Sequence, residues 1–437
     1  MIRDAHLLSA FDAAKYIAEG QLTSEALVHH CIDRIQARNP AVQALVAFDA
    51  EQALREAKRI DVQPRRPHLH GLPFAAKDIL ETAELPTAYG SPIYAGYRPL
   101  IDAACITQFR SQGCALIGKA ATSEFATRKP AATCNPLRLT HTPGGSSSGS
   151  AAAVADFMVP FALGTQTTGS IARPASYCGV VGFKPTFDFF NRMGLKNSSQ
   201  SQDTIGLLTR TIRDAFFLAF NDPGFDAAVD SAGTPGFAVC MSSQWKGVDP
   251  SFGTMLDRLR ATATKAGNPL HDVTLNSKLE NLIAIQEQIF VYEAAQALSH
   301  ERQHHFEQLS DVLRKRLAPA QDINADMYLQ SRSAVEKSKS EIDALFGDHD
   351  VLIYPATESS AEAGIAYSGS PRLGALWTLL HLPTVVVPFG RSSDDMPFGL
   401  QLIGRFGQDR QLLTAAAILQ RSFSDDAVSA LHYYQRG

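Results

Sequence analysis

Short apolar runs punctuated by glycine and proline recur near both ends of the chain and constrain its fold more than any other feature. Helical patterns separate these runs, and such alternation is typical of an α/β layer. The runs expected to form strands are 72–76, 115–117, 180–183, 351–354, 384–387 and 399–403. Because these runs come from both halves of the chain, we predict one sheet assembled from both ends, within a single domain over residues 1–437.

Helices are predicted to flank and interrupt this sheet. Residues 1–65 carry N-terminal helical patterns, 66–215 form the core of the sheet, and 351–437 return to it with a last helix over 411–420. Between about 249 and 350 the sequence is charged and helical. We expect two long helices there, over 279–316 and 325–345, as an insertion that covers one edge of the sheet.

The composition excludes several classes of protein. Forty basic and 44 acidic residues are mixed along the chain without a basic block, so no nucleic-acid partner is expected. The N-terminus lacks the pattern of a secretion signal, and the longest apolar stretch, 150–164, is too short to span a membrane. Six scattered cysteines are interpreted as buried thiols. We expect a cytoplasmic protein with no membrane partner. The sequence is compatible with a homodimer but does not determine the oligomeric state.

The stretch 141–186 contains the residues best suited to chemistry. It begins with His141-Thr-Pro-Gly-Gly-Ser146-Ser-Ser-Gly-Ser150 and leads into an alanine-rich helix. Its glycines permit backbone angles that other residues avoid, but no lysine follows them, which argues against a nucleotide-binding loop. Four hydroxyls in five positions exceed what a turn needs. This loop by itself leaves a structural turn and an active site equally open.

A second loop, Thr167-Thr168-Gly169-Ser170, favours an active site. Gly169 can turn consecutive backbone N–H groups toward one point, as an oxyanion hole requires, and a serine beside them is a natural nucleophile. Histidine is the usual base for serine, and His141 is the only one near either loop. No aspartate accompanies it at an informative spacing, so we interpret His141 as a structural loop residue.

These two loops closely resemble the amidase signature family. The chain has G-G-S-S-x-G-S and then G-T-x-T-x-G-S-I, with Ser170 placed 24 positions after Ser146. Further matching blocks lie along nearly the whole chain, at 71–79, 122–125, 135–136, 178–185, 203–206, 377–383 and 399–404. The resemblance implies a single domain with a mixed, mostly parallel sheet covered by helices.

The resemblance also implies roles for individual residues. Lys77 matches the family's lysine, Ser146 its bridging serine after a cis peptide bond, and Ser170 its nucleophile. The implied oxyanion hole is formed by the backbone N–H groups of Thr167, Thr168, Gly169 and Ser170. The implied activity is hydrolysis of the C–N bond of a small carboxamide through an acyl-enzyme, with no metal or other cofactor.

A lysine can serve as the base only when it is neutral. With an unperturbed pKa of about 10.4, about one lysine in 2,500 is neutral at pH 7, but burial disfavours the ammonium and lowers the pKa. The apolar flanks 74–76 and 79–80 fit a buried Lys77. Asp78 should face away from it, because adjacent residues of a strand point to opposite sides.

The second loop departs in three ways from the pattern Asp-x-Gly-Gly-Ser-x-Arg of many family members. Gln166 replaces the Asp, Thr168 replaces the first Gly, and Arg173 lies one position later than the family's Arg. A β-branched Thr168 resists positive φ, so either φ is negative there or the loop is strained. The loop is similar to that of malonamidase-type members, which act on small amides carrying a carboxylate. We expect Arg173, with Gly145 and Gln166, to contact the substrate; a structural arginine paired with a buried acid is the alternative.

Two other functions remain as alternatives. His300-Glu301-Arg302-Gln303-His304 spells H-E-x-x-H, the zinc-binding pattern of metalloproteases, but its polar surroundings favour unrelated surface histidines. The second alternative is the glutamine-hydrolysing subunit of a tRNA-dependent amidotransferase, which shares the family pattern and needs partner subunits. Tyr177 and Trp377 are interpreted as core residues and not as pocket lining.

Overall fold

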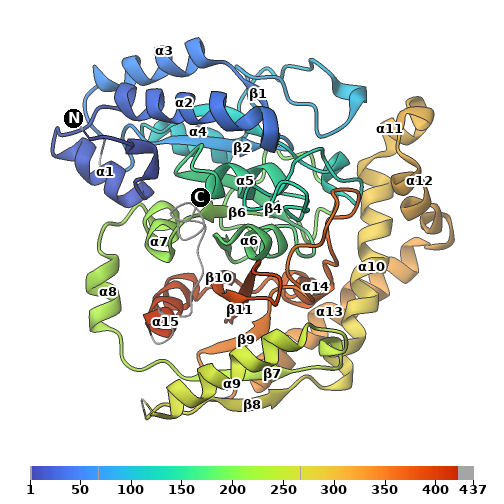
Figure 1. The fold of residues 1–437 in the computed structure, drawn as a ribbon. Coiled ribbons are helices and arrows are strands. Elements are labelled where there is room, and N and C mark those ends of the chain that lie inside the picture. The colour runs from blue at the N-terminus through green and yellow to red at the C-terminus, as the bar shows by residue number, and fades with distance from the viewer. Residues whose placement is uncertain (1, 67, 266, 422–437) are drawn as a thin grey trace.

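A computed structural model describes residues 2–66, 68–265 and 267–421 (Figure 1). In these residues one sheet has the strand order β1-β3-β2-β4-β6-β5-β10-β11-β9-β7-β8. The strands are β1 Leu45–Phe48, β2 Pro73–Lys77, β3 Ala115–Ala120, β4 Phe161–Gln166, β5 Val181–Lys184, β6 Thr204–Thr209, β7 Phe237–Met241, β8 His271–Thr274, β9 Val351–Pro355, β10 Thr384–Arg391 and β11 Pro397–Gly404. Strands from the two halves of the chain meet where β5 pairs with β10. The predicted single sheet from both ends of the chain is confirmed.

The sheet is mixed, as expected, but it is not mostly parallel. Six of its ten neighbouring pairs are antiparallel. The reason lies in the connections: β10 and β11 are joined by a short turn, which permits only antiparallel pairing. Parallel pairs occur where a helix crosses over between strands, as between β2 and β3 and between β7 and β8.

Helices cover the sheet on both sides. They are α1 Ala10–Ala18, α2 Ser24–Val42, α3 Ala50–Asp61, α4 Ala104–Ser111, α5 Ser148–Ala155, α6 Ala172–Cys178, α7 Ile212–Phe220, α8 Phe225–Ser231, α9 Pro250–Lys265, α10 Ser277–Ala297, α11 Ser299–His304, α12 Asp311–Leu317, α13 Ala325–Phe346, α14 Arg372–Leu379 and α15 Asp409–Arg421. Several begin at a Ser, Thr, Asp or Asn whose side chain accepts a backbone N–H, as Thr23 does for α2. Within the described parts of the chain, no helix is long and apolar enough to cross a membrane.

The charged segment after residue 249 differs from the prediction in two ways. The helix expected over 279–316 is interrupted and forms α10, α11 and α12 (Figure 1). The break before α12 coincides with a tertiary contact. The Glu124 carboxylate accepts from both the N–H and the hydroxyl of Ser310, which caps α12. The segment also contributes β8 to an edge of the sheet. By contrast, α13 lies close to the predicted bounds.

Two fully buried helices, α5 and α6, lie against the centre of the sheet. Small residues make this possible, since α5 has the sequence Ser-Gly-Ser-Ala-Ala-Ala-Val-Ala. The N–H of Gly149 donates to the carbonyl of Ala121 over 3.0 Å. The N-terminus of α5 is thereby held against the end of β3. Five of the six cysteines are buried as predicted, Cys134 is partly exposed, and all six are free.

We predict that Gly149→Ala destabilises the protein, although alanine usually stabilises a helix relative to glycine by about 1 kcal/mol. A Cβ at Gly149 would stand 2.2 Å from the backbone nitrogen of Ala121 and 2.2 Å from the backbone oxygen of Ala44. Overpacking against backbone should lower the free energy of unfolding by about 3 kcal/mol or more in urea denaturation.

The matched control is Gly253→Ala in α9, where a Cβ would meet nothing within 4 Å. This variant should be as stable as the parent or slightly more stable. A Gly149→Ala protein with unchanged stability would show that the close packing of α5 on β3 is wrong.

Candidate active site

The amine of Lys77 lies in the interior, at the end of β2. Its Nζ is 2.7 Å from Ser146 Oγ, 2.7 Å from Thr165 Oγ1 and 3.4 Å from the Thr165 carbonyl oxygen. Ser146 follows Gly145 through a cis peptide bond, as the resemblance implied. The structure therefore brings together a lysine and a serine that are 69 positions apart in the chain.

Burial lowers the pKa of Lys77 from its ordinary 10.5 to about 7. The negative charge of Asp203 opposes this change, and the positive charge of Arg173 adds to it. Asp78 takes no part, because it faces the other side of the strand, where its carboxylate lies 3.2 Å from Lys119 Nζ. The predicted direction of Asp78 is confirmed.

Ser170 lies between β4 and α6 in a loop that Gln166 holds in place. The Gln166 side-chain oxygen accepts from the backbone N–H groups of Ile171 and Ala172, over 2.8 Å and 3.0 Å. Its amide nitrogen donates to Thr378 Oγ1 over 3.0 Å. The side chain of Gln166 is fully buried, and its amide oxygen and nitrogen both bind within the protein, so the structure gives it a role in holding the loop, while the predicted contact with the substrate stays a prediction.

The loop from Thr167 to Ser170 presents its backbone N–H groups without using them. In the described structure, none of the hydrogen bonds involves the N–H of Thr167, Thr168, Gly169 or Ser170. Thr168 is not among the residues with positive φ, which answers the question left open by its β-branched side chain. Two side-chain contacts hold the loop: Thr167 Oγ1 donates to Asp203, and Thr168 Oγ1 accepts from Gln286 of α10.

Arg173 is a buried cation that makes no ion pair with an acidic side chain among the residues that the structure describes. Only 5% of the residue is exposed, and Nη2 donates to the carbonyl oxygen of Gly145. Its Nε and Nη1 atoms are buried and have no partner among the described residues. Burial lowers the pKa of Arg173 to about 10, and the nearby Tyr177 and Tyr367 oppose this change. The alternative of a structural arginine would require a buried acid beside it, and none pairs with Arg173 in the described ranges.

Two residues of this site were not assigned a role from the sequence. Thr165 supplies the second hydroxyl at Lys77, and it belongs to the same G-T-x-T pattern as the oxyanion loop. Asp203 accepts from Thr167 and from the backbone N–H groups of Ser198 and Ser199, over 2.6 Å and 2.9 Å. The sequence signal that could have identified Asp203 is its position in the block 203–206, which matches the family.

Other residues weighed from the sequence lie outside this site. His141 Nδ1 is 3.0 Å from Thr140 Oγ1, in agreement with a structural loop residue. Glu301 is buried and accepts from Tyr94 and Lys196, whereas the two histidines of the H-E-x-x-H pattern are exposed. In the described residues, no group of three His, Cys, Asp or Glu side chains could hold a metal ion.

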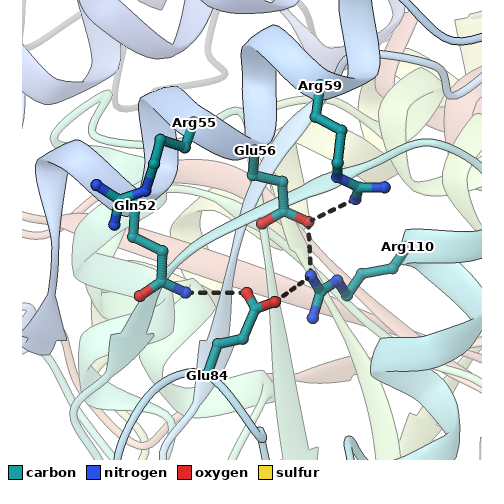
Figure 2. A pocket seen from close by; sticks show the side chains of 6 residues that line it. All are labelled: Gln52, Arg55, Glu56, Arg59, Glu84 and Arg110. Carbon is teal, nitrogen blue, oxygen red and sulfur yellow. Dashed lines mark hydrogen bonds and ion pairs between the residues drawn. The ribbon is translucent and has the colours of Figure 1, made fainter.

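Tyr177 and Trp377 are buried core residues, as predicted. Figure 2 shows a pocket away from these groups, lined by Gln52, Arg55, Glu56, Arg59, Glu84 and Arg110. Its charges pair among themselves, with Arg110 Nη2 lying 2.9 Å from Glu56 and 3.0 Å from Glu84. None of the predicted site residues lines this pocket, and its ion pairs connect α3 to α4.

Comparison with known proteins gives a consistent result. The Amidase family model matches residues 26–413. A glutamyl-tRNA(Gln) amidotransferase subunit from Oleidesulfovibrio alaskensis is 30% identical, over 96% of this chain and 98% of its own. A native peptide amidase from Stenotrophomonas maltophilia is 25% identical with a TM-score of 0.81, over 96% of this chain and 97% of its own. A crystal structure of an amidase is 27% identical with a TM-score of 0.85, over 95% of this chain and 100% of its own.

We predict that Gln166→Leu lowers stability, because it leaves the buried backbone N–H groups of Ile171 and Ala172 without their acceptor and removes one of the hydrogen bonds of the Thr378 hydroxyl. At about 1–3 kcal/mol for an unsatisfied buried group, the free energy of unfolding in urea should fall by about 2–4 kcal/mol. The exposed Gln108→Leu change should cost less than about 0.5 kcal/mol. Unchanged stability with a raised KM would instead restore the substrate-binding role.

Proposed function

The chain belongs to the amidase family, and on this premise we propose that it is a free-standing amidohydrolase for a small carboxamide that carries a carboxylate. The observation that carries the proposal is the buried Lys77 amine at 2.7 Å from the Ser146 hydroxyl. Ser170 lies next to this pair in the fold, because its carbonyl oxygen accepts from the backbone N–H of Ser147 over 3.3 Å. The proposal keeps the cytoplasmic location and the absence of a metal or other cofactor expected from the sequence.

In the proposed mechanism, neutral Lys77 accepts the proton of Ser146 while Ser146 accepts that of Ser170. Ser170 Oγ attacks the amide carbonyl, and the backbone N–H groups of residues 167–170 stabilise the oxyanion. The relay then returns a proton to the leaving nitrogen, and the C–N bond breaks. Water hydrolyses the acyl-enzyme by the same route in reverse.

The environment of Lys77 lowers the energy that this relay requires at neutral pH. An unperturbed lysine forfeits about 4.6 kcal/mol when it must act in its neutral form at pH 7. With a pKa of about 7, half of the Lys77 side chains are already neutral, and the penalty falls to about 0.4 kcal/mol. The contacts of Nζ are hydroxyls and one carbonyl, so no carboxylate in contact restores the charge.

Arg173 supports the choice of a substrate with a carboxylate. It stands three positions after Ser170, and two of its guanidinium nitrogens are buried without a partner in the described structure. A carboxylate matches the planar fork of a guanidinium and would supply the missing acceptors. Since Arg173 also contacts Gly145, next to Ser146, such a carboxylate would lie close to the scissile amide.

The name of one relative suggests a second candidate function, that of a glutamyl-tRNA(Gln) amidotransferase subunit. The glutamyl-tRNA(Gln) amidotransferase protein from Oleidesulfovibrio alaskensis is similar over nearly the whole chain. Glutamine carries both a side-chain amide and a carboxylate, so Arg173 by itself does not separate the two functions. Strong preference of the isolated chain for glutamine over small carboxamides would favour the amidotransferase role.

We predict ammonia release from malonamate and succinamate in preference to malonamide and succinamide, which lack the carboxylate. Measured at a pH well above the pKa of Lys77, where the charge of Arg173 is not needed to keep the base neutral, Arg173→Met should lower kcat/KM for the charged amides by about 100-fold and leave the neutral amides within a few-fold, because only the charged ones lose a buried ionic partner. Ser170→Ala should abolish all release. Equal turnover of charged and neutral amides by the parent would remove the carboxylate from the proposal, and turnover by Ser170→Ala would remove the nucleophile.

We predict that kcat/KM for a neutral amide rises about tenfold per pH unit below pH 7 and reaches a plateau above it. The sign follows from the lowered pKa of Lys77: the neutral base is scarce below about pH 7 and complete above it. Lys184→Met is the matched control, because burial also lowers the pKa of Lys184 to about 7 although it is no part of the relay. A rise that continues to pH 10 would show that Lys77 keeps its ordinary pKa.

A further inference from the structure

The hydroxyl of Ser123, in the loop after β3, is not used by any described part of the protein. Ser123 is completely buried, and its Oγ has no hydrogen-bond partner there. A buried hydroxyl left in this state costs about 1–3 kcal/mol. Since native proteins pair nearly all buried polar groups, this hydroxyl is expected to have a partner beyond the described residues, and a bound ligand can supply it.

Ser123 lies directly beside the proposed relay. Its backbone N–H donates to the carbonyl oxygen of Ser146 over 3.3 Å. Its Oγ lies 3.2 Å from the point where a Cβ on Gly145 would stand, and Ser368 Oγ lies 3.3 Å from the same point. Two hydroxyls from loops far apart in the sequence therefore flank the residue that precedes Ser146.

The same glycine is in contact with the unpaired cation. The carbonyl oxygen of Gly145 accepts from Arg173 Nη2, while Nε and Nη1 remain without partners in the described structure. The surroundings of Gly145 thus combine a guanidinium with unused donors and a buried unused hydroxyl. Donors gathered around one point, with a positive charge among them, match an anionic acceptor.

The backbone around Ser123 is held in a strained turn. Phe125 and Ala126 have φ of 46° and 55°, which residues other than glycine rarely adopt. The turn is fixed from several sides: Ala126 N–H donates to the Ser123 carbonyl over 2.8 Å, and Ser198 Oγ donates to the Phe125 carbonyl over 2.7 Å. Strain of this kind persists only where the surroundings enforce it, and it is concentrated at functional sites.

We propose that the Ser123 hydroxyl, together with that of Ser368, completes an anion subsite whose cationic group is Arg173, and donates to the carboxylate of the bound amide. This inference rests on the proposed function and deepens it, because it assigns the groups that position the substrate's acyl part. Ser123 and Ser368 are substrate-binding residues here and take no part in proton transfer.

The test measures binding of malonate and succinate to the full chain by calorimetry, which requires no turnover. The parent should bind at least one of the two, and Ser123→Ala should weaken that binding about tenfold or more, as expected for a hydrogen bond to a charged group. Ser150→Ala is the matched control, because the buried Ser150 hydroxyl already donates to the Leu163 carbonyl over 2.9 Å. Its affinity should stay within twofold of the parent's.

A kinetic measurement separates this inference from the proposed function. Ser123→Ala should raise KM for malonamate or succinamate about tenfold more than it raises KM for the corresponding diamides, which lack the carboxylate. If the parent hydrolyses none of the amides, the proposed function fails, while the binding of the dianions still decides the subsite.

Three results would overturn the subsite. The first is a parent that binds neither dianion. The second is a Ser123→Ala protein that binds as the parent does but melts at a lower temperature, which would mean that the hydroxyl holds only an internal water. The third result applies if Ser123→Ala does not fold. Ser368→Ala is then measured in its place, and an affinity equal to that of the parent would overturn the subsite.

Discussion

The burial of one amine, that of Lys77, is the constraint on which the rest of this site depends. A pKa lowered from 10.5 to about 7 means that burial costs the charged form about 5 kcal/mol. Lys119 on the adjacent strand is buried as well, but it pairs with Asp78, and its pKa falls only to about 8. Two neighbouring strands thus each bury a lysine. The carboxylate of Asp78 favours the charged form of Lys119, whereas the side-chain partners of Lys77 are hydroxyls. The difference between a structural ion pair and a candidate base is the partner, since both amines are removed from water.

The loop that presents Ser170 depends on all parts of the chain. Gln286 of α10 donates to Thr168 Oγ1, and Thr378 of α14 donates to the Thr168 carbonyl. Packing is equally close, because a Cβ at Gly374 would stand 2.5 Å from that carbonyl oxygen. Helix α10 of the insertion and helix α14 of the C-terminal part therefore fix a loop encoded between β4 and α6. A site of this kind cannot be cut out as a smaller unit, which agrees with family similarity that extends over nearly the whole chain.

The sequence predicted those features that are local or shared with a family, and missed those decided by tertiary contacts. The strands flanking the motifs were found because glycine and apolar runs mark them. Motif spacing singled out Lys77 and Ser146, which the structure brings into contact, and Ser170, whose role stays a prediction. β4 was missed because its residues continue the apolar stretch of α5, and period alone does not separate the two. The mostly parallel sheet was predicted wrongly, because the short connection from β10 to β11 was not interpreted as a hairpin. The interruption before α12 and the internal hydrogen bonds of Gln166 were missed, because they involve partners distant in sequence, Glu124 and Thr378.

The neutral base and the unpaired cation are two sides of one electrostatic arrangement. A carboxylate in contact with Lys77 would favour its ammonium and disable it as a base. The positive charge of Arg173 acts in the opposite sense and helps to keep Lys77 neutral. A protein acid paired with Arg173 would cancel that help, so the arginine serves the base best when it has no partner within the chain. A substrate carboxylate bound at Arg173 also offsets that help, but only while the substrate is present, whereas a protein acid would do so permanently. The buried guanidinium therefore performs two tasks, both of which require that no acidic side chain of the protein neutralises it.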